Sequence, residues 1–83
     1  MDIFDLLCAN MVEVVPKLEN VQIKPTDSMR TLCTNSIDRM DVLVSTLEAL
    51  DLTIPFTELH GPKNLQELAD LLAKKASEKT EKI

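Results

Sequence analysis

The chain has 83 residues, with nine Lys or Arg against fourteen Asp or Glu and a net charge of −5 at pH 7. A protein of this length forms one small domain that buries only about 60% of its unfolded surface, which argues against a large enclosed active site. The acidic balance argues against nucleic acid as the main partner, because phosphate binding needs a basic surface.

The sequence carries no membrane or disulfide signal. No apolar run approaches the ~20 residues of a membrane span, and Asp2 and Asp5 stand where a signal peptide carries positive charge. Cys8 and Cys33 are too few for a disulfide framework and lack metal-ligand spacing, so we interpret both as small hydrophobic residues. With a start at Met1, these features predict a freestanding cytoplasmic monomer without metal or membrane contacts.

Negative charge is concentrated in the first part of the chain. Residues 74–83 hold four lysines and two glutamates, which leaves five bases, twelve acids and a net charge of −7 in residues 1–73. Such a charge steers partners with basic docking patches toward the protein.

The first predicted helix covers residues 2–15 and ends before Pro16, because proline inside a helix removes a hydrogen bond and clashes with the preceding turn. Its apolar face, at helical spacing, is Ile3, Phe4, Leu7, Met11, Val14 and Val15. Residues 16–35 follow without a sustained period, and a connection of this length is often functional. A short helical turn is expected after Pro25, and the residues expected to hold the segment to the core are Val21, Ile23, Met29 and Leu32.

The second predicted helix covers residues 36–50. The stripe expected to be buried is Ile37, Met40, Leu43, Val44, Leu47 and Leu50. Asp41, Ser45 and Glu48 form a polar row with Asp38 nearby, and Arg39 points away from that row. Val42 lies off the stripe beside the acids, where an exposed apolar contact is expected.

The remaining chain predicts one short and one long helix. A short helix near 56–60 is expected to turn Phe56 and Leu59 inward, between turns formed by proline and glycine. The last helix covers about 64–76, is capped by Asn64, and has as its core face Leu65, Leu68, Ala69, Leu72 and Ala76. The predicted fold is therefore all-α: a small four-helix bundle with three main helices, one short third helix and a long first loop. It divides into a domain of residues 1–76 and a flexible charged tail of residues 77–83.

Ser36 stands at a position suited to covalent attachment. If Asn35 is the N-cap, Ser36 is the first helical residue and its hydroxyl is not needed for capping. A phosphate ester there would lie beside free backbone N–H groups at the positive end of the helix dipole. From these residues alone, the alternative that Ser36 or Thr34 is itself the cap stays open.

The run Leu32-Cys33-Thr34-Asn35-Ser36-Ile37-Asp38 and its flanking helices resemble the acyl carrier protein family, over about residues 3–75. In that family an Asp-Ser-Leu motif opens the second helix, and a phosphopantetheinyl transferase attaches 4′-phosphopantetheine from coenzyme A to its serine. The motif matches at Ser36 and conservatively at Ile37, whereas Asn35 replaces the usual Asp.

The run Asn35-Ser36-Ile37-Asp38-Arg39 is similar to a narrower group, the freestanding carriers of bacterial polyketide and antibiotic pathways that install β-methyl branches. In that group the carrier presents an acetyl thioester to a homologue of 3-hydroxy-3-methylglutaryl-CoA (HMG-CoA) synthase. The resemblance implies that Ser36 holds the arm and catalyses nothing, that the cargo is acetyl or malonyl, and that an acyltransferase and a ketosynthase-like decarboxylase are further partners.

The resemblance also implies a partner surface at the second helix, made of Ile37, Asp38, Arg39, Met40, Asp41, Val42 and Glu48. For Met40 the periodicity favours a core position, and for the acids a merely solvated face is an equal alternative.

Three alternatives stay open at this point. The chain could be a non-catalytic helical adaptor without a cofactor, or a small enzyme acting through Cys33 or His60. Against an enzyme, no basic neighbour of Cys33 is evident to lower its pKa, and His60 precedes a Gly-Pro turn. Within the carrier class, the cargo could instead be a fatty acyl or aminoacyl group.

Overall fold

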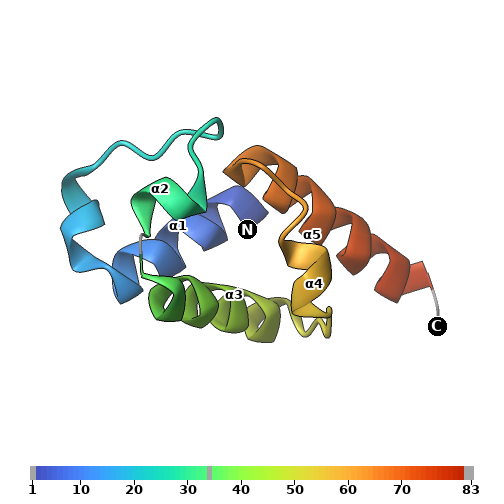
Figure 1. Ribbon diagram of the computed structural model, residues 1–83. Helices are drawn as coiled ribbons and strands as arrows, with labels where there is room; N and C mark the ends of the chain where they lie inside the picture. Colours follow the sequence, from blue (N-terminus) through green and yellow to red (C-terminus); the bar gives the residue numbers. More distant parts are fainter. Residues whose placement is uncertain (1, 34, 82–83) are drawn as a thin grey trace.

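The computed structural model describes residues 2–33 and 35–81, with side chains as far as Glu78. Within these ranges every regular element is helical, in agreement with the predicted all-α fold (Figure 1). The elements in chain order are α1 (Ile3–Val14), the 3-10 helix η1 (Pro16–Asn20), α2 (Met29–Leu32), α3 (Ser36–Leu50), α4 (Phe56–Leu59) and α5 (Leu65–Glu81).

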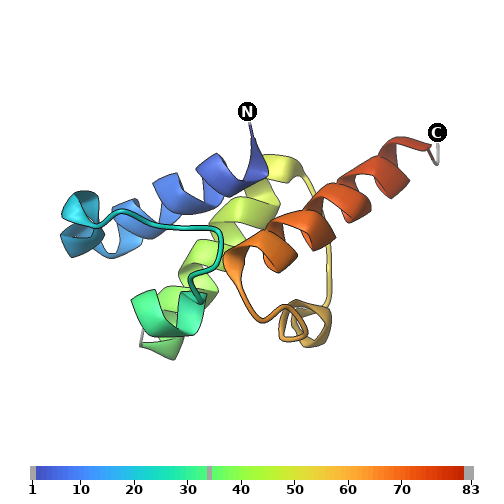
Figure 2. The same cartoon turned by 90° about the horizontal axis from the view of Figure 1, so that it is seen from above.

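The long helices α1, α3 and α5 enclose the core, and Figure 2 shows α1 and α5 lying across α3. The buried side chains form two clusters. One is Leu7, Leu47, Ile54, Leu59, Leu68, Ala69 and Leu72. The other is Met11, Val15, Leu18, Cys33, Val42 and Leu65. These residues are almost all aliphatic, as a chain with only two aromatic residues requires.

A buried polar contact fixes α1 against α3. Thr46 is fully buried in α3, where its Oγ1 donates to the carbonyl of Val42 at 2.8 Å. The same oxygen accepts a hydrogen bond from Nδ2 of Asn10 in α1 at 2.9 Å. Both polar groups are thereby satisfied in an otherwise apolar interface, which sets the register of the two helices.

The connection between α1 and α3 contains more structure than the sequence pattern indicated. Pro16 starts η1, a position where its fixed φ is favourable. The helical turn begins later than predicted, at Met29, where the Ser28 hydroxyl accepts from the backbone N–H of Arg30 at 3.1 Å. Ile23, Met29 and Leu32 pack against the second cluster as predicted, but Val21 is 44% exposed, so its predicted anchoring role is wrong.

The same connection caps the start of α5. The carbonyls of Pro25 and Asp27 accept from the backbone N–H groups of Gln66 and Leu65, each at 2.9 Å. Asn64 provides the predicted side-chain cap by accepting from the N–H of Glu67 at 2.8 Å. In both views the connection passes beside the start of α5 (Figures 1 and 2). The connection therefore satisfies donors that a helix start leaves unpaired.

The bounds of α3 agree with the prediction, but its buried face does not. Val42 is 0% exposed and Met40 is 52% exposed, the reverse of what the periodicity indicated. Ile37 and Val44 are also exposed, whereas Leu47 is buried. The core face is rotated because α3 packs against α1 through Val42 and Thr46 and leaves its first turn outside the core.

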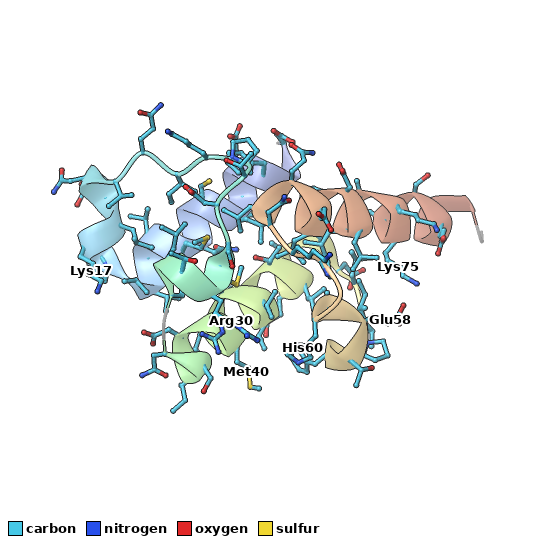
Figure 3. The ribbon with its side chains drawn as sticks, turned by 45° about the horizontal axis from the view of Figure 1, so that its top comes forward. Lys17, Arg30, Met40, Glu58, His60 and Lys75 are labelled. Atoms are coloured by element: carbon cyan, nitrogen blue, oxygen red, sulfur yellow. The ribbon has the colours of Figure 1, made fainter. Side chains whose placement is uncertain are left out.

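The C-terminal part differs in two details. Leu59 is buried as predicted, but Phe56 is 37% exposed and does not fill the core. Helix α5 continues to Glu81, so the predicted end near residue 76 is wrong, while the division into a domain and a tail stays a prediction. The Lys75 ammonium lies 3.1 Å from the Glu58 carboxylate and links α5 to α4 (Figure 3).

Candidate functional site

Ser36 is the first residue of α3 and is exposed. Asn35 supplies the cap, because its Oδ1 accepts from the N–H of Ile37 at 2.8 Å, as predicted. The carbonyl of Asn35 accepts from the N–H of Arg39 at 3.1 Å and starts the helical hydrogen bonding. Since Asn35 performs the capping, the hydroxyl of the exposed Ser36 is not needed for it.

Arg39 lies one turn after Ser36 and bends back over the start of the helix. Its Nη1 donates to the carbonyl of Cys33 at 2.8 Å, which holds the guanidinium beside the first turn of α3. Arg39 therefore places positive charge near Ser36 in a fixed position.

A pocket of ≈ 460 Å³ opens beside Ser36, between α2, the first turns of α3, and the segment from α4 to the start of α5. Its apolar lining includes Leu43, Leu59, Leu65 and Leu68. Its charged or titratable lining is Arg30, Arg39, His60 and Lys63. The sequence analysis missed this pocket, because nothing in the pattern indicates that Arg30 in the long connection converges with Lys63 before α5.

Only some of the residues predicted to form the partner surface are exposed. Ile37 and Met40 are exposed near Ser36, and Asp41 and Glu48 are exposed further along α3. Asp38 and Arg39 are partly buried. Val42 is fully buried and cannot contact a partner directly, so its predicted place on this surface is wrong. The exposed Val44 extends the apolar part of this surface in its place.

The cysteines do not form a nucleophilic site. Cys33 is 1% exposed, and its thiol pKa is raised by burial and by Asp38, against a smaller opposing effect of Arg39 and Lys17. The pKa of Cys8 is likewise raised by burial and by two nearby aspartates. A thiol with a raised pKa is a poor nucleophile at neutral pH. His60 is exposed at the end of α4, as the turn interpretation predicted.

Two further observations bear on the other predicted features. Within residues 2–33 and 35–81, no helix is long and apolar enough to cross a membrane. The described part of the chain also contains no group of three or more His, Cys, Asp or Glu side chains that could hold a metal ion. The cytoplasmic location and the monomeric state stay predictions.

Comparison with known proteins places the chain in a family. No family model matches it. A polyketide biosynthesis acyl-carrier protein of Bacillus subtilis (strain 168), AcpK, is 41% identical over 70 residues, which are 84% of this chain and 85% of the relative. The chain therefore belongs to the acyl carrier protein family, as its sequence predicted.

Similarity to a solved structure indicates a narrower group within this family. The structure is similar to a chain from the crystal structure of the HMG synthase of the curacin biosynthetic pathway in complex with its acetyl donor acyl carrier protein, with a TM-score of 0.81 and 38% sequence identity. The match covers 88% of this chain and 94% of that chain, so the two chains have similar lengths. The predicted resemblance to donor acyl carrier proteins of polyketide pathways is thereby confirmed.

Proposed function

We propose that this protein is a donor acyl carrier protein in polyketide β-branching. It carries an acetyl group, loaded as malonyl or acetyl, on 4′-phosphopantetheine attached to Ser36, and delivers it to an HMG-CoA-synthase-like enzyme. The observation that carries the attachment site is the exposed Ser36 at the start of α3, whose hydroxyl is not needed for capping because Asn35 caps the helix. When attached, the cofactor supplies the thiol that holds the acyl group, and Ser36 itself catalyses nothing.

The residues around Ser36 are compatible with a phosphodiester-linked arm. Arg39 is held beside the first turn of α3, and its positive charge is favourable for an anion attached to Ser36. The exposed position of Ser36 leaves room for a transferase to reach the hydroxyl. The raised thiol pKa values of Cys8 and Cys33 favour an external thiol over the chain's own cysteines as the acyl carrier.

The attachment is tested by intact mass measurement after incubation with coenzyme A and a broad-specificity phosphopantetheinyl transferase. The expected result is the gain of one phosphopantetheine in the wild type and in Ser45→Ala, a control at an exposed serine of the same helix. Ser36→Ala is expected to gain nothing. A folded wild type that gains no mass with several transferases would instead favour the adaptor without a cofactor.

The partner surface is proposed to be the exposed face of α3, with Ile37, Met40 and Val44 as apolar contacts and Asp41 and Glu48 as acidic contacts. The partly buried Asp38 is proposed as a third acidic contact at its edge. An acyltransferase and a ketosynthase-like decarboxylase are proposed to use the same face during loading. Met40→Glu is expected to slow acetyl transfer to an HMG-CoA-synthase-like enzyme severalfold. Val21→Glu, at an exposed apolar residue outside this face, is the matched control and should leave transfer unchanged.

Two other cargoes are separated by loading assays. A fatty acid carrier accepts long acyl chains into elongation, and an aminoacyl carrier is loaded by an adenylating enzyme. Faster loading with either cargo than with malonyl or acetyl would replace the proposed cargo and leave the attachment at Ser36 intact.

A further inference from the structure

The mouth of the pocket beside Ser36 has an unusual charge for this protein. Residues 1–73 contain only five Lys or Arg and twelve Asp or Glu. Three of those five bases, Arg30, Arg39 and Lys63, line this pocket, together with the chain's single histidine, His60. Among the described residues that line it, none is acidic. The pocket is therefore a local positive site on a protein that is otherwise strongly negative.

The bases reach this site from different elements. Arg30 comes from α2, and His60 and Lys63 come from the turn between α4 and α5. All three side chains are exposed. Figure 3 shows Arg30 and His60 on the same side as Met40, whereas Lys17 lies at another end of the molecule. The positive charge is thus assembled by the fold and stays accessible to a charged ligand.

An aromatic ring lies at the same site. Phe56, the first residue of α4, lines the pocket and is 37% exposed. The other phenylalanine of the chain, Phe4, is partly buried and packs against both core clusters. An exposed aromatic face beside cationic side chains is the combination that binds nucleotides, because the base stacks on the ring while phosphates pair with the cations. The chemistry of the site therefore fits a nucleoside phosphate.

The proposed loading reaction brings one nucleotide to Ser36, which itself lines the pocket. The serine oxygen attacks the phosphorus of coenzyme A that bears pantetheine, and the bond from that phosphorus to the bridging oxygen breaks. Adenosine 3′,5′-bisphosphate leaves with the electron pair, and the serine proton passes to a base of the transferase. Coenzyme A is thus a reactant at Ser36 that carries both a nucleobase and several phosphate charges.

We propose that the pocket mouth binds the adenosine 3′,5′-bisphosphate portion of coenzyme A while Ser36 is being loaded. The reacting pyrophosphate is at Ser36, so the 3′-phosphate is the group that reaches Arg30 and Lys63, and the adenine stacks on Phe56. The proposal rests on the proposed function, in that Ser36 is the acceptor. The carrier then supplies part of the coenzyme A site that is completed by the transferase.

This arrangement predicts which kinetic constant depends on the bases. The 3′-phosphate and the adenine are not altered in the reaction, so contacts to them stabilise the bound substrate and the transition state equally. Such contacts lower the KM for coenzyme A and leave kcat unchanged. A contact with the transferase protein would instead change the KM for the carrier.

Kinetics with a broad-specificity transferase test the contact with the 3′-phosphate. Arg30→Gln with Lys63→Gln should raise the KM for coenzyme A about tenfold at saturating carrier, with kcat unchanged. With 3′-dephospho-coenzyme A, which lacks that phosphate, the variant and the wild type should have equal KM values. An unchanged KM for coenzyme A, or an equal rise with both substrates, would overturn the proposal.

The chain offers a matched control for net charge. Lys17→Gln with Lys24→Gln removes the other two bases of residues 1–73, which do not line the pocket, and should leave the KM for coenzyme A unchanged. Equal effects of the two pairs of substitutions would assign the change to net charge and overturn the proposal. A rise only in the KM for the carrier would overturn it too, by assigning Arg30 and Lys63 to contact with the transferase.

A titration tests the site without any loading at Ser36. Unmodified Ser36→Ala is titrated with adenosine 3′,5′-bisphosphate and, separately, with adenosine, while backbone amide signals are followed by NMR. We expect the bisphosphate to shift the signals of Arg30, Phe56 and Lys63, and adenosine to bind about tenfold more weakly. Absence of shifts with the bisphosphate would overturn the proposal, while the mass gain of the wild type at Ser36 would still stand. Absence of that mass gain would remove the role in loading even if the titration shows a nucleotide site.

Discussion

At the scale of single residues, Asn35 has two separable roles. It caps α3 through the N–H of Ile37, and it stands where the family motif has an Asp. Asn35→Ala is expected to destabilise the protein by about 1 kcal/mol, because the helix start loses its acceptor. Asn35→Asp keeps the acceptor and should stay within about 0.5 kcal/mol of the wild type.

Urea denaturation measures both changes, and the initial rate of mass gain with a broad-specificity transferase measures the second role. We expect Asn35→Asp to be modified faster than the wild type, since it restores the acid of the motif. If Asn35→Asp were modified at the wild-type rate, the departure from the motif would have no consequence for recognition.

Thr46 is not marked by any pattern in the sequence. Its hydroxyl accepts from Asn10 and donates to the carbonyl of Val42, all within the interface of α1 and α3. Thr46→Val keeps the shape but leaves the Asn10 amide without this acceptor, so we expect a loss of about 1–2 kcal/mol in the free energy of unfolding.

The control for this prediction is a double-mutant cycle with Asn10→Leu. Because the second substitution removes the orphaned amide, the double variant should be more stable than the sum of the two single losses implies. Strict additivity in urea denaturation would contradict a direct interaction between the two side chains.

The two cysteine thiols predict a pH dependence of stability. Both have a pKa raised in the folded state, chiefly by burial, so the folded protein holds their protons more tightly than the unfolded chain does. Their contribution is fully present below the pKa of the unfolded thiol, about 8.5, and is lost as pH rises through the folded pKa. We therefore expect stability to fall above about pH 8.5.

The measurement is urea denaturation under reducing conditions, for the wild type and for the double variant Cys8→Ala with Cys33→Ala. The pH is varied from about 7 to 10, which is roughly the range over which thiols titrate. The substituted protein is less stable overall because Cys33 is buried, but its stability should decline less steeply with pH. Parallel slopes in the two proteins would assign the decline to other groups, such as lysines.

At the scale of elements, local sequence signals predicted where helices begin and end better than they predicted which side of a helix is buried. Pro16, Asn35 and Asn64 marked helix ends that the structure confirms, because capping and proline effects act within one turn. The buried face of α3 could not be obtained in that way. Its apolar residues surround more than one side of the helix, and only the position of α1 decides that Val42 is covered and Met40 is not.

This corrected face of α3 gives a direct prediction. Val42→Ala is expected to cost about 1–3 kcal/mol in unfolding free energy, because it opens a cavity in the core. Met40→Ala should change stability by less than about 0.5 kcal/mol, since half of its surface is already exposed.

Acetyl transfer to the partner enzyme provides the second measurement. Met40→Ala should slow transfer while Val42→Ala, assayed where it is folded, should not. The reverse pattern would restore the interpretation that the periodicity of the sequence first favoured.

At the scale of the whole molecule, only part of the site could be predicted. Ser36 is identifiable because its motif is continuous in the sequence, whereas the pocket depends on residues from α2, α3 and the turn before α5. No local pattern reports such convergence. The distribution of charge could be predicted in part. The excess of acids follows from composition, but the gathering of basic residues at the pocket is visible only in the fold.

The excess of acids predicts a salt-dependent delivery rate. Residues 1–73 carry a net charge of −7, and exposed acids such as Asp41 and Glu48 lie on the proposed partner face. If basic patches on the HMG-CoA-synthase-like enzyme are steered toward them, kcat/KM for acetyl transfer should fall severalfold as ionic strength rises from about 0.05 to 0.5 M, where the screening length shortens. Acetyl-pantetheine, an uncharged small donor, should show no such fall, which separates steering from an effect of salt on the enzyme.

Paired substitutions locate that effect on the surface. Asp41→Asn with Glu48→Gln should lower the rate at low salt and flatten its salt dependence, because these exposed acids lie on α3, the helix that begins at Ser36. Glu13→Gln with Glu19→Gln changes the net charge equally at exposed positions on α1 and η1, and should alter the rate much less. Equal effects of the two pairs would mean that net charge alone governs encounter. A larger effect of the α3 pair would mean that the enzyme approaches along the face that presents the arm, so the same helix would both hold the cargo and select its recipient.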